Sequence, residues 1–207
     1  GAMLAKMRNL GEACTAANRF YIASNVAPEF IEKFKKRMAV LKVGNGLDPT
    51  VDVGPLVNAD TRNKVAAFVK DALEKGAKLE LGGKIPIGKG FYYPPTILSN
   101  VSSDADCVHD EIFGPVAAIQ TFDDEADLIT RANDTEYGLV AYVFTKDLKR
   151  GLAISEKLDY GMVGLNRGLV SDPAAPFGGT KQSGLGREGG HEGMLEFMES
   201  QYISVEW

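Results

Sequence analysis

Residues 115–166 read PVAAIQTFDDEADLITRANDTEYGLVAYVFTKDLKRGLAISEKLDYGMVGLN, and this stretch decides the fold. Three apolar runs of strand length alternate in it with two segments of helical periodicity. The strands are expected at 115–122, 139–145 and 161–166, and the helices at 124–134 and 148–159. Such alternation is typical of right-handed crossovers. The stretch therefore predicts an α/β fold with an open, mostly parallel sheet that has helices on both faces.

The residues before this stretch show the same kinds of pattern. Strands are expected at 19–24 and 78–83, and helices at 28–44 and 58–77. The second helix has Asn58 or Asp60 as a candidate N-cap and Gly76 at its end. Residues 85–101 are rich in glycine and proline and predict a loop with an edge strand, because proline cannot donate a hydrogen bond to a central strand pair.

After the stretch, the pattern changes. Residues 168–190, GLVSDPAAPFGGTKQSGLGREGG, are dense in glycine and have almost no periodicity. Loops of this length inside a compact domain are usually functional. A helix is expected at 191–200. The final residues 201–207, QYISVEW, alternate as a strand does and predict pairing with a sheet outside the domain.

Composition restricts the class of protein. The 207 residues carry a net charge of −5 with bases and acids interspersed, so no nucleic-acid partner is expected. No apolar run reaches the roughly 20 residues of a membrane helix, and no secretory signal is visible, so we expect a cytoplasmic protein without a membrane partner. Two cysteines, Cys14 and Cys107, suit a reducing compartment. Cys107 with His109 is too short a pattern to predict a metal site.

Cys14 is the first candidate for chemistry. It lies in MRNLGEACTAANRF, residues 7–20, after a glycine and before residues that are compatible with a helix. A cysteine near a helix N-terminus has its thiolate stabilised by the helix dipole and by free backbone N–H groups, which makes it a nucleophile. The alternative is a cysteine that packs in the core as a small hydrophobic residue. The local sequence leaves both interpretations open.

Two further motifs carry candidate residues. EIFGP, residues 111–115, places the carboxylate of Glu111 and the ring of Phe113 at the head of a strand. These groups suit a ribose and a flat ring, and the alternative is a plain surface turn. PFGGTKQSGLGRE, residues 176–188, has glycines that allow a ligand to approach the backbone. It follows no strand directly and opens no helix at its first glycine, so it is not a dinucleotide phosphate loop.

Together, the three motifs resemble one family. RNxGxxC at 8–14, ExFGP at 111–115 and PFGGxKxSGxGRExG at 176–190 occur in the order and at the spacings of the C-terminal part of the aldehyde dehydrogenase superfamily. The resemblance extends from about Met7 to Trp207. It implies an NAD- or NADP-dependent dehydrogenase that oxidises an aldehyde through a covalent adduct with a cysteine.

The resemblance also implies a division of the chain. Residues 4–199 correspond to the catalytic domain that carries the cysteine, and residues 200–207 to a C-terminal strand that joins subunits of a homo-oligomer, a dimer or tetramer. Residues 1–3 look like the remainder of a cleaved expression tag and are set aside from the fold. The family's nucleotide-binding domain, general-base glutamate and oxyanion asparagine lie upstream of the nucleophile. We therefore expect the chain alone to oxidise aldehydes negligibly and to bind NAD or NADP weakly.

Individual residues match family positions. Cys14 falls at the nucleophile, and its backbone N–H at the oxyanion site. Glu111 and Phe113 match the residues that hold the nicotinamide ribose and the neighbouring surface of the cofactor. Glu188 matches a buried glutamate linked to proton movement, and Phe177 lies on the substrate side.

Arg8 and Ser171 narrow the substrate. Members of the superfamily that oxidise succinate semialdehyde have an arginine six residues before the nucleophile and a serine in the loop before PFGG, and both bind the far carboxylate. For Arg8 the alternative is a structural salt bridge, and for the substrate it is glutarate semialdehyde or another aldehyde. Glu12 stands where many relatives have glutamine and adds a carboxylate near Cys14.

Two other classes of function remain open. A non-catalytic interaction module would use residues 201–207 to add a strand to a partner. A hydrolase that acts through Cys14 would need a histidine base, and neither His109 nor His191 stands in a recognisable pairing with it.

Overall fold

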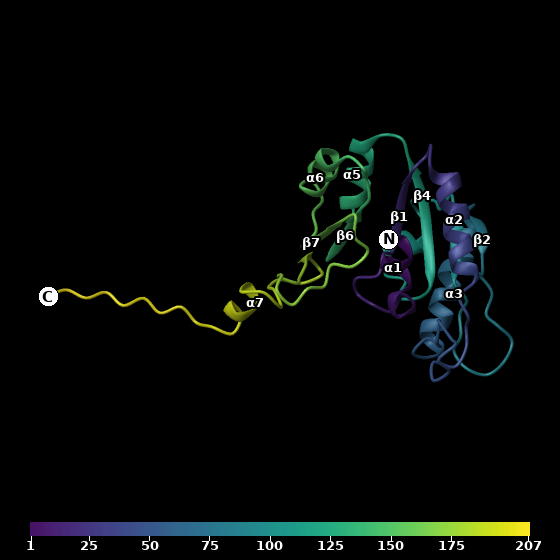
Figure 1. The fold of residues 1–207 in the computed structure, drawn as a ribbon, viewed down its shortest axis with the longest axis horizontal. Helices are drawn as coiled ribbons and strands as arrows, with labels where there is room; N and C mark the ends of the chain where they lie inside the picture. Colours follow the sequence, from purple (N-terminus) through teal and green to yellow (C-terminus); the bar gives the residue numbers. More distant parts are fainter. The chain divides into compact units, whose positions relative to one another are not determined.

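The computed structural model describes residues 1–207 (Figure 1). The helices and helical turns are α1 (Ala2–Met7), η1 (Arg8–Gly11), α2 (Ala27–Ala39), α3 (Ala59–Glu74), α4 (Asp106–His109), α5 (Glu125–Asn133), α6 (Leu148–Ser155) and α7 (Glu192–Leu195). The strands are β1 (Arg19–Ala23), β2 (Lys78–Leu81), β3 (Thr96–Ser99), β4 (Val116–Phe122), β5 (Tyr137–Gly138), β6 (Val140–Val143), β7 (Met162–Leu165) and β8 (Thr180–Lys181). The fold is α/β with mostly parallel pairing in its longer strands, which confirms the predicted class.

The chain divides into two compact units, Gly1–Ala132 and Asn133–Trp207. The first is built on a four-stranded sheet with the order β1-β4-β3-β2. β4 pairs in parallel with both β1 and β3, whereas β2 runs antiparallel to β3. Phe20 of β1 lies opposite Ile119 of β4. Parallel neighbours cannot be joined by a tight hairpin, and the helices between the strands provide the crossovers.

Two hydrophobic cores cover the two faces of this sheet. Val116 and Ala118 of β4 belong to the core that contains α3 and α4. Ala117 and Ile119 belong to the opposite core, which contains α2 and residues of α1. Successive side chains of a strand point to opposite faces, so β4 supplies both cores. Cys107 of α4 lies in the first core and is completely buried.

The ends of α3 follow from local chemistry. The Oδ1 atom of its N-cap, Asn58, accepts a hydrogen bond from the backbone N–H of Thr61 at 2.8 Å. Gly76 follows the last turn with a φ of +93°, in the left-handed region that suits glycine after a helix. Asn58 is therefore the cap, and the predicted stop at Gly76 is confirmed.

The helix α2 is shorter than predicted. It ends at Ala39 rather than near Gly44. Val43 instead forms a parallel bridge with Val53, and the N–H of Gly44 donates to the carbonyl of Val53 at 3.0 Å. Backbone groups that bind this second segment cannot also continue the helix.

The prediction of an edge strand within residues 85–101 is wrong. β3 lies between β4 and β2, and all four of its residues are buried. Pro94 and Pro95 precede the strand, so no proline interrupts its hydrogen bonds, and the edge is formed by β2. Because both prolines lie before the strand rather than within it, they do not prevent β3 from pairing on both sides.

Residues 1–3 take part in the fold, contrary to the expectation that set them aside. α1 begins at Ala2, and the N–H of Ala5 donates to the carbonyl of Gly1 at 2.9 Å. Ala2 and Met3 pack against the core that contains α2. A short helix that buries apolar side chains gains stability that its local sequence alone does not supply.

The second unit contains a β–α–β element. β6 and β7 pair in parallel and are joined by α6, while β5 and β8 form a separate antiparallel pair. Gly151 lets α6 approach β7, because a Cβ atom there would lie 2.7 Å from the side chain of Leu165. Asn166, with φ of +55°, follows β7, and its side chain both donates to and accepts from the backbone of Thr145 at 2.9 Å.

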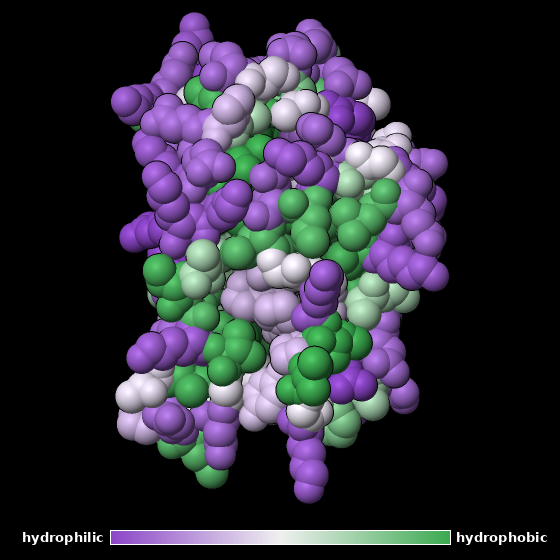
Figure 2. All heavy atoms as spheres, turned by 90° about the vertical axis from the view of Figure 1, so that its right-hand side faces the viewer, coloured by the Kyte–Doolittle hydropathy of each residue, from purple (hydrophilic) through white to green (hydrophobic).

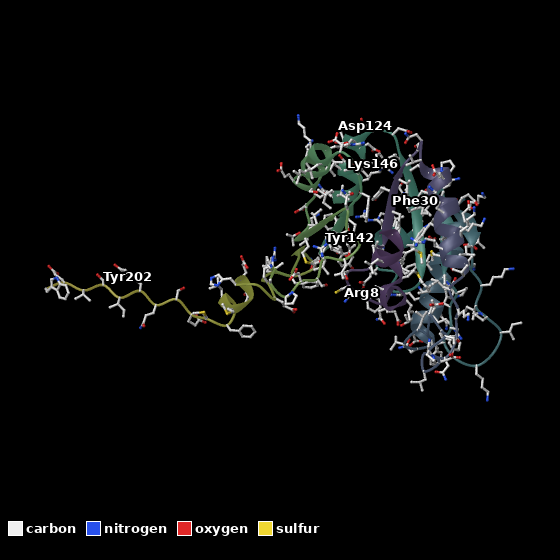
Figure 3. All side chains as sticks on the ribbon, viewed as in Figure 1. Arg8, Phe30, Asp124, Tyr142, Lys146 and Tyr202 are labelled. Carbon is white, nitrogen blue, oxygen red and sulfur yellow. The ribbon has the colours of Figure 1, made fainter.

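The end of the second unit differs from the sequence prediction. The helix expected at 191–200 is reduced to α7, and residues 201–207 form no strand within this chain. In Figures 1 and 3 they run as an extended segment, on which Tyr202 is labelled. Tyr202 is 89% exposed and Trp207 fully exposed. A strand needs a neighbour for its backbone hydrogen bonds, and residues 201–207 have none here.

No helix is both long and apolar enough to cross a bilayer. In Figure 2, apolar side chains gather in separate groups between hydrophilic ones on the face of the molecule that is shown.

Candidate active site

The sequence suggested that Cys14 stands at the start of a helix, but the structure has a loop there. Asn9 and Leu10 each have φ of +47°, and Gly11 has +84°. The N–H of Ala16 then donates to the carbonyl of Ala13 at 2.9 Å and closes a turn in which Cys14 is the second residue. The chain continues into β1, because pairing with β4 outweighs the weak helical preference of these residues. No helix dipole therefore acts on Cys14, which is exposed.

The glycine of this loop touches the EIFGP turn. A Cβ atom at Gly11 would lie 2.3 Å from the carbonyl oxygen of Gly114. A Cβ atom at Gly114 would in turn lie 2.7 Å from the side chain of Val65 in α3, which is completely buried. Two motifs that are about a hundred residues apart in sequence are thus in direct backbone contact, and only glycine fits at either position.

The carboxylate of Glu12 binds a backbone group outside the cysteine loop. Its Oε1 atom accepts a hydrogen bond from the N–H of Val57 at 3.2 Å, and its backbone carbonyl accepts one from the side chain of Asn9 at 2.7 Å. Glu12 therefore fastens the cysteine loop to the segment before α3.

The EIFGP turn presents two side chains and buries one. Ile112 is fully buried, Glu111 is exposed and Phe113 is partly buried with φ of +50°. Nζ of Lys64 donates to the backbone carbonyl of Glu111 at 3.1 Å, which leaves the Glu111 carboxylate to other partners. A non-glycine residue in the left-handed region is uncommon and marks a position that the surroundings enforce.

Asn18, which the sequence reasoning missed, connects these two motifs. Its Nδ2 group donates to the carbonyls of Cys107, at 3.1 Å, and Asp110, at 3.0 Å. Its Oδ1 atom accepts from the N–H of Ile112 at 2.9 Å. An asparagine four residues after a candidate nucleophile was the only sequence signal, and nothing local shows which groups its amide reaches.

Lys6 is the second residue that the sequence reasoning missed. It lies in α1 with only 1% of its surface exposed. Burial lowers the pKa of its ammonium group to about 7, although nearby Glu111 and Cys107 act to raise it. The Glu111 carboxylate, which the sequence predicts on the cofactor side, therefore acts electrostatically on this buried amine.

The Lys6→Met variant should be more stable than the wild type at pH 6. The unfolded lysine has a pKa near 10.5, so between pH 7 and 10.5 the unfolded chain binds more protons than the folded one. The free energy of unfolding of the wild type therefore rises with pH through this window. Below pH 7, where the buried amine is charged, Lys6 destabilises the fold to its full extent. At about 1.4 kcal/mol per pKa unit, the variant should gain up to a few kcal/mol at pH 6.

Urea unfolding followed by circular dichroism between pH 6 and 9 measures the difference in free energy of unfolding between the variant and the wild type. This difference should shrink steadily as pH rises above 7. Lys70→Met, at a side chain that is 75% exposed, serves as the control and should leave both stability and pH dependence almost unchanged. A Lys6→Met protein that is less stable than wild type at every pH would contradict the expectation.

In the second unit, two predicted site residues are paired through their backbones. The N–H of Phe177 donates to the carbonyl of Glu188, and the N–H of Glu188 donates to the carbonyl of Phe177, both at 2.7 Å. Arg187 reinforces this closure, because its Nη1 group donates to the carbonyls of Gly179 and Gly186. The long glycine-rich loop is therefore a closed hairpin-like structure.

Side-chain exposure in this loop corrects one expectation. Glu188 matches a buried glutamate of the family, but here its side chain is exposed. Its backbone N–H and carbonyl are paired with those of Phe177. Ser171 is also exposed, and Phe177 is partly buried. Nζ of Lys181 anchors the loop on the carbonyls of Asn133, at 2.9 Å, and Thr135, at 3.2 Å.

The structure thus places four of the predicted residues in the first unit: Arg8, Cys14, Glu111 and Phe113. Figure 3 shows Arg8, which is exposed, at the end of α1. The second unit carries the other three: Ser171, Phe177 and Glu188. No group of three or more histidine, cysteine or acidic side chains is arranged to hold a metal ion.

The sequence of residues 1–203 matches the model of the aldehyde dehydrogenase family. The chain belongs to this family. The motifs that carried the resemblance all fall within the matched residues, and the α/β fold agrees with it.

Named relatives of this aldehyde dehydrogenase chain extend the comparison. The succinate-semialdehyde dehydrogenase of Paenarthrobacter nicotinovorans is 51% identical over 205 residues, which are 99% of this chain and 46% of that protein. The glutarate-semialdehyde dehydrogenase of Pseudomonas aeruginosa is 45% identical over 205 residues, 99% of this chain and 42% of that protein. The crystal structure of an aldehyde dehydrogenase from Brucella melitensis biovar abortus 2308 has a TM-score of 0.94 and 47% identity, covering 98% of this chain and 41% of that chain. The chain spans less than half the length of each relative.

Proposed function

We propose that the protein that carries this chain oxidises succinate semialdehyde to succinate with NAD or NADP, using Cys14 as the nucleophile. The observation that supports this most is the backbone contact of Gly11 with Gly114. It joins the loop with the exposed Cys14 to the turn with Glu111 and Phe113, so a reactive thiol and a cofactor-side carboxylate belong to one local structure.

Cys14 carries the covalent chemistry in this proposal. Its thiolate adds to the aldehyde carbon, a C–S bond forms, and the C=O electrons move to oxygen to give a thiohemiacetal. The backbone N–H of Cys14 is the group of this chain that would donate to that oxygen. NAD or NADP, when bound, would supply the hydride acceptor for this carbon, and Glu111 and Phe113 are the residues of this chain that would hold it. Water then cleaves the resulting thioester, which releases the carboxylic acid and returns the thiol.

Glu111 and Phe113 suit the dinucleotide. Glu111 is exposed, and an ionised carboxylate only accepts hydrogen bonds, so it can receive two ribose hydroxyl groups. The partly buried ring of Phe113 offers a flat apolar surface next to it.

Arg8 and Ser171 are proposed to bind the far carboxylate of the substrate. The planar guanidinium group of arginine can bind a carboxylate with two parallel hydrogen bonds. Glutarate semialdehyde is the second candidate, because a glutarate-semialdehyde dehydrogenase is 45% identical to this chain. The two substrates differ by one methylene group, which is worth only about 1 kcal/mol in a pocket.

The Arg8→Ala variant should lower kcat/KM for succinate semialdehyde about 100-fold or more, since a charge-assisted bidentate pair contributes a few kcal/mol. For butanal, which has the same chain length and no carboxylate, kcat/KM should change less than about threefold. Steady-state kinetics of the complete protein with both aldehydes gives the comparison. Arg8→Lys keeps the charge but loses the fork and should fall between wild type and Arg8→Ala.

An equal loss for both aldehydes would show that Arg8 is structural and would remove the substrate assignment. Absence of NAD(P)-dependent oxidation of any aldehyde by the wild-type protein would remove the proposed function itself.

Residues 201–207 are proposed to add a strand to a second copy of the protein. The exposed apolar residues Ile203, Val205 and Trp207 alternate with Ser204 and Glu206, and the segment pairs with no strand of this chain. A reducing compartment keeps exposed thiols free of disulfides, and this supports the proposal of a cytoplasmic location. A non-catalytic interaction module remains the alternative, and the kinetics above distinguish it.

A further inference from the structure

The side chain of Asn18 spans the gap between two functional motifs. It lies four residues after Cys14, just before β1, and is partly buried. Its amide makes three hydrogen bonds, all to the backbone of residues 107–112. A side-chain amide that makes three hydrogen bonds to one distant backbone segment holds that segment in a single conformation.

Two of these bonds lie on either side of Glu111. The carbonyl of Asp110, which accepts from Nδ2, belongs to the peptide group before Glu111. The N–H of Ile112, which donates to Oδ1, belongs to the peptide group after it. Lys64 donates to the carbonyl of that second peptide group. Both peptide planes that meet at the Cα atom of Glu111 are therefore fixed, and with them the direction in which its side chain leaves the backbone.

We infer that Asn18 is a positioning residue, which holds the Glu111 carboxylate at a fixed place relative to the Cys14 loop for binding of the dinucleotide ribose. This inference rests on the proposed function. No ionised side chain can replace the amide, because the site requires two donors and one acceptor. Aspartate keeps the acceptor for Ile112 but turns a carboxylate oxygen toward the carbonyls of Cys107 and Asp110.

The test uses the Asn18→Asp variant of the complete protein. At pH 7.5, KM for NAD or NADP should rise about tenfold or more, while labelling of Cys14 by iodoacetamide without cofactor changes less than about twofold. The proton of a protonated aspartate can restore one donor. The ratio of the variant's KM to that of the wild type should therefore fall as pH drops from 7.5 to 5, which a merely structural defect would not produce.

Two further variants keep the test independent of misfolding. Lys64→Met removes an exposed side chain that holds the Glu111 carbonyl and should raise the dinucleotide KM by a smaller factor, about threefold. Asn63→Asp, at an exposed position one residue earlier, is the matched control and should leave KM unchanged.

The outcomes separate the two proposals. If the wild-type protein oxidises the semialdehyde and Asn18→Asp has an unchanged dinucleotide KM, the role of Asn18 is overturned and the proposed function stands. If the wild-type protein shows no dinucleotide-dependent oxidation, the proposed function fails and the role of Asn18 fails with it.

Discussion

Replacing Cys14 by serine is expected to lower aldehyde oxidation by the complete protein by about three orders of magnitude or more. In the proposed mechanism the thiolate forms the covalent adduct, and a serine hydroxyl without an adjacent base is a far weaker nucleophile. The substitution is nearly isosteric and lies at an exposed position, so the fold should be unaffected. The rate of NAD(P)H formation measures the loss of activity, and circular dichroism verifies the fold.

The second cysteine gives the matched control. Cys107 is fully buried, and burial raises the pKa of its thiol to about 11, so it should react slowly with thiol reagents. Cys107→Ala should keep most of the activity and lose only a modest amount of stability. In this chain, a rapid labelling phase should be present in wild type and Cys107→Ala and absent in Cys14→Ser. Equal, slow labelling of both cysteines would count against Cys14 as nucleophile.

The second large effect is expected for stability. Gly11→Ala should lower the free energy of unfolding by more than about 3 kcal/mol, or displace the EIFGP turn. The new methyl group would lie 2.3 Å from the carbonyl oxygen of Gly114, far inside contact distance. Gly114 is itself closely packed, because a Cβ atom built there would lie 2.7 Å from the side chain of the buried Val65. The left-handed φ of +84° adds a conformational cost of about 1 kcal/mol.

Alanine substitutions at two other glycines distinguish the steric clash with Gly114 from the conformational cost of a left-handed φ. Gly76 has φ of +93° with open space around its Cβ position, so Gly76→Ala should cost only about 1 kcal/mol. Gly46 has neither a left-handed φ nor a neighbour within 4 Å, and Gly46→Ala should be almost neutral. Urea unfolding of the three variants gives the comparison. Equal costs at Gly11 and Gly76 would mean that the contact with Gly114 is not tight.

Much of the fold could be predicted because its signals are local. The alternation of apolar strands and periodic helices predicted the α/β class. Two candidate caps, Asn58 and Asp60, and the stop at Gly76 predicted the ends of α3, and the structure selects Asn58. The prediction failed where a segment depends on its neighbours. β3 was expected at an edge because of the prolines before it, whereas its place between β4 and β2 is decided by the other strands.

The candidate site divides in the same way. The sequence supplied the residues, because Arg8, Cys14, Glu111, Phe113, Ser171, Phe177 and Glu188 all lie in short motifs. It also suggested a helix after Cys14, and the structure has a turn instead, because three consecutive left-handed residues and pairing of β1 with β4 direct the chain. Asn18 and Lys6 were missed, since their partners lie about a hundred residues away along the chain.

The sequence by itself determined the fold class, the family and the chemical types available to the site. These follow from periodicity, caps and motif spacing, which are properties of short stretches. Only the tertiary structure decided that Gly11 meets Gly114, that Asn18 binds the peptide groups on both sides of Glu111 and that Lys6 is buried. Close packing and hydrogen bonding depend on which distant groups the folded chain brings within about 3 Å, and no local pattern encodes those distances.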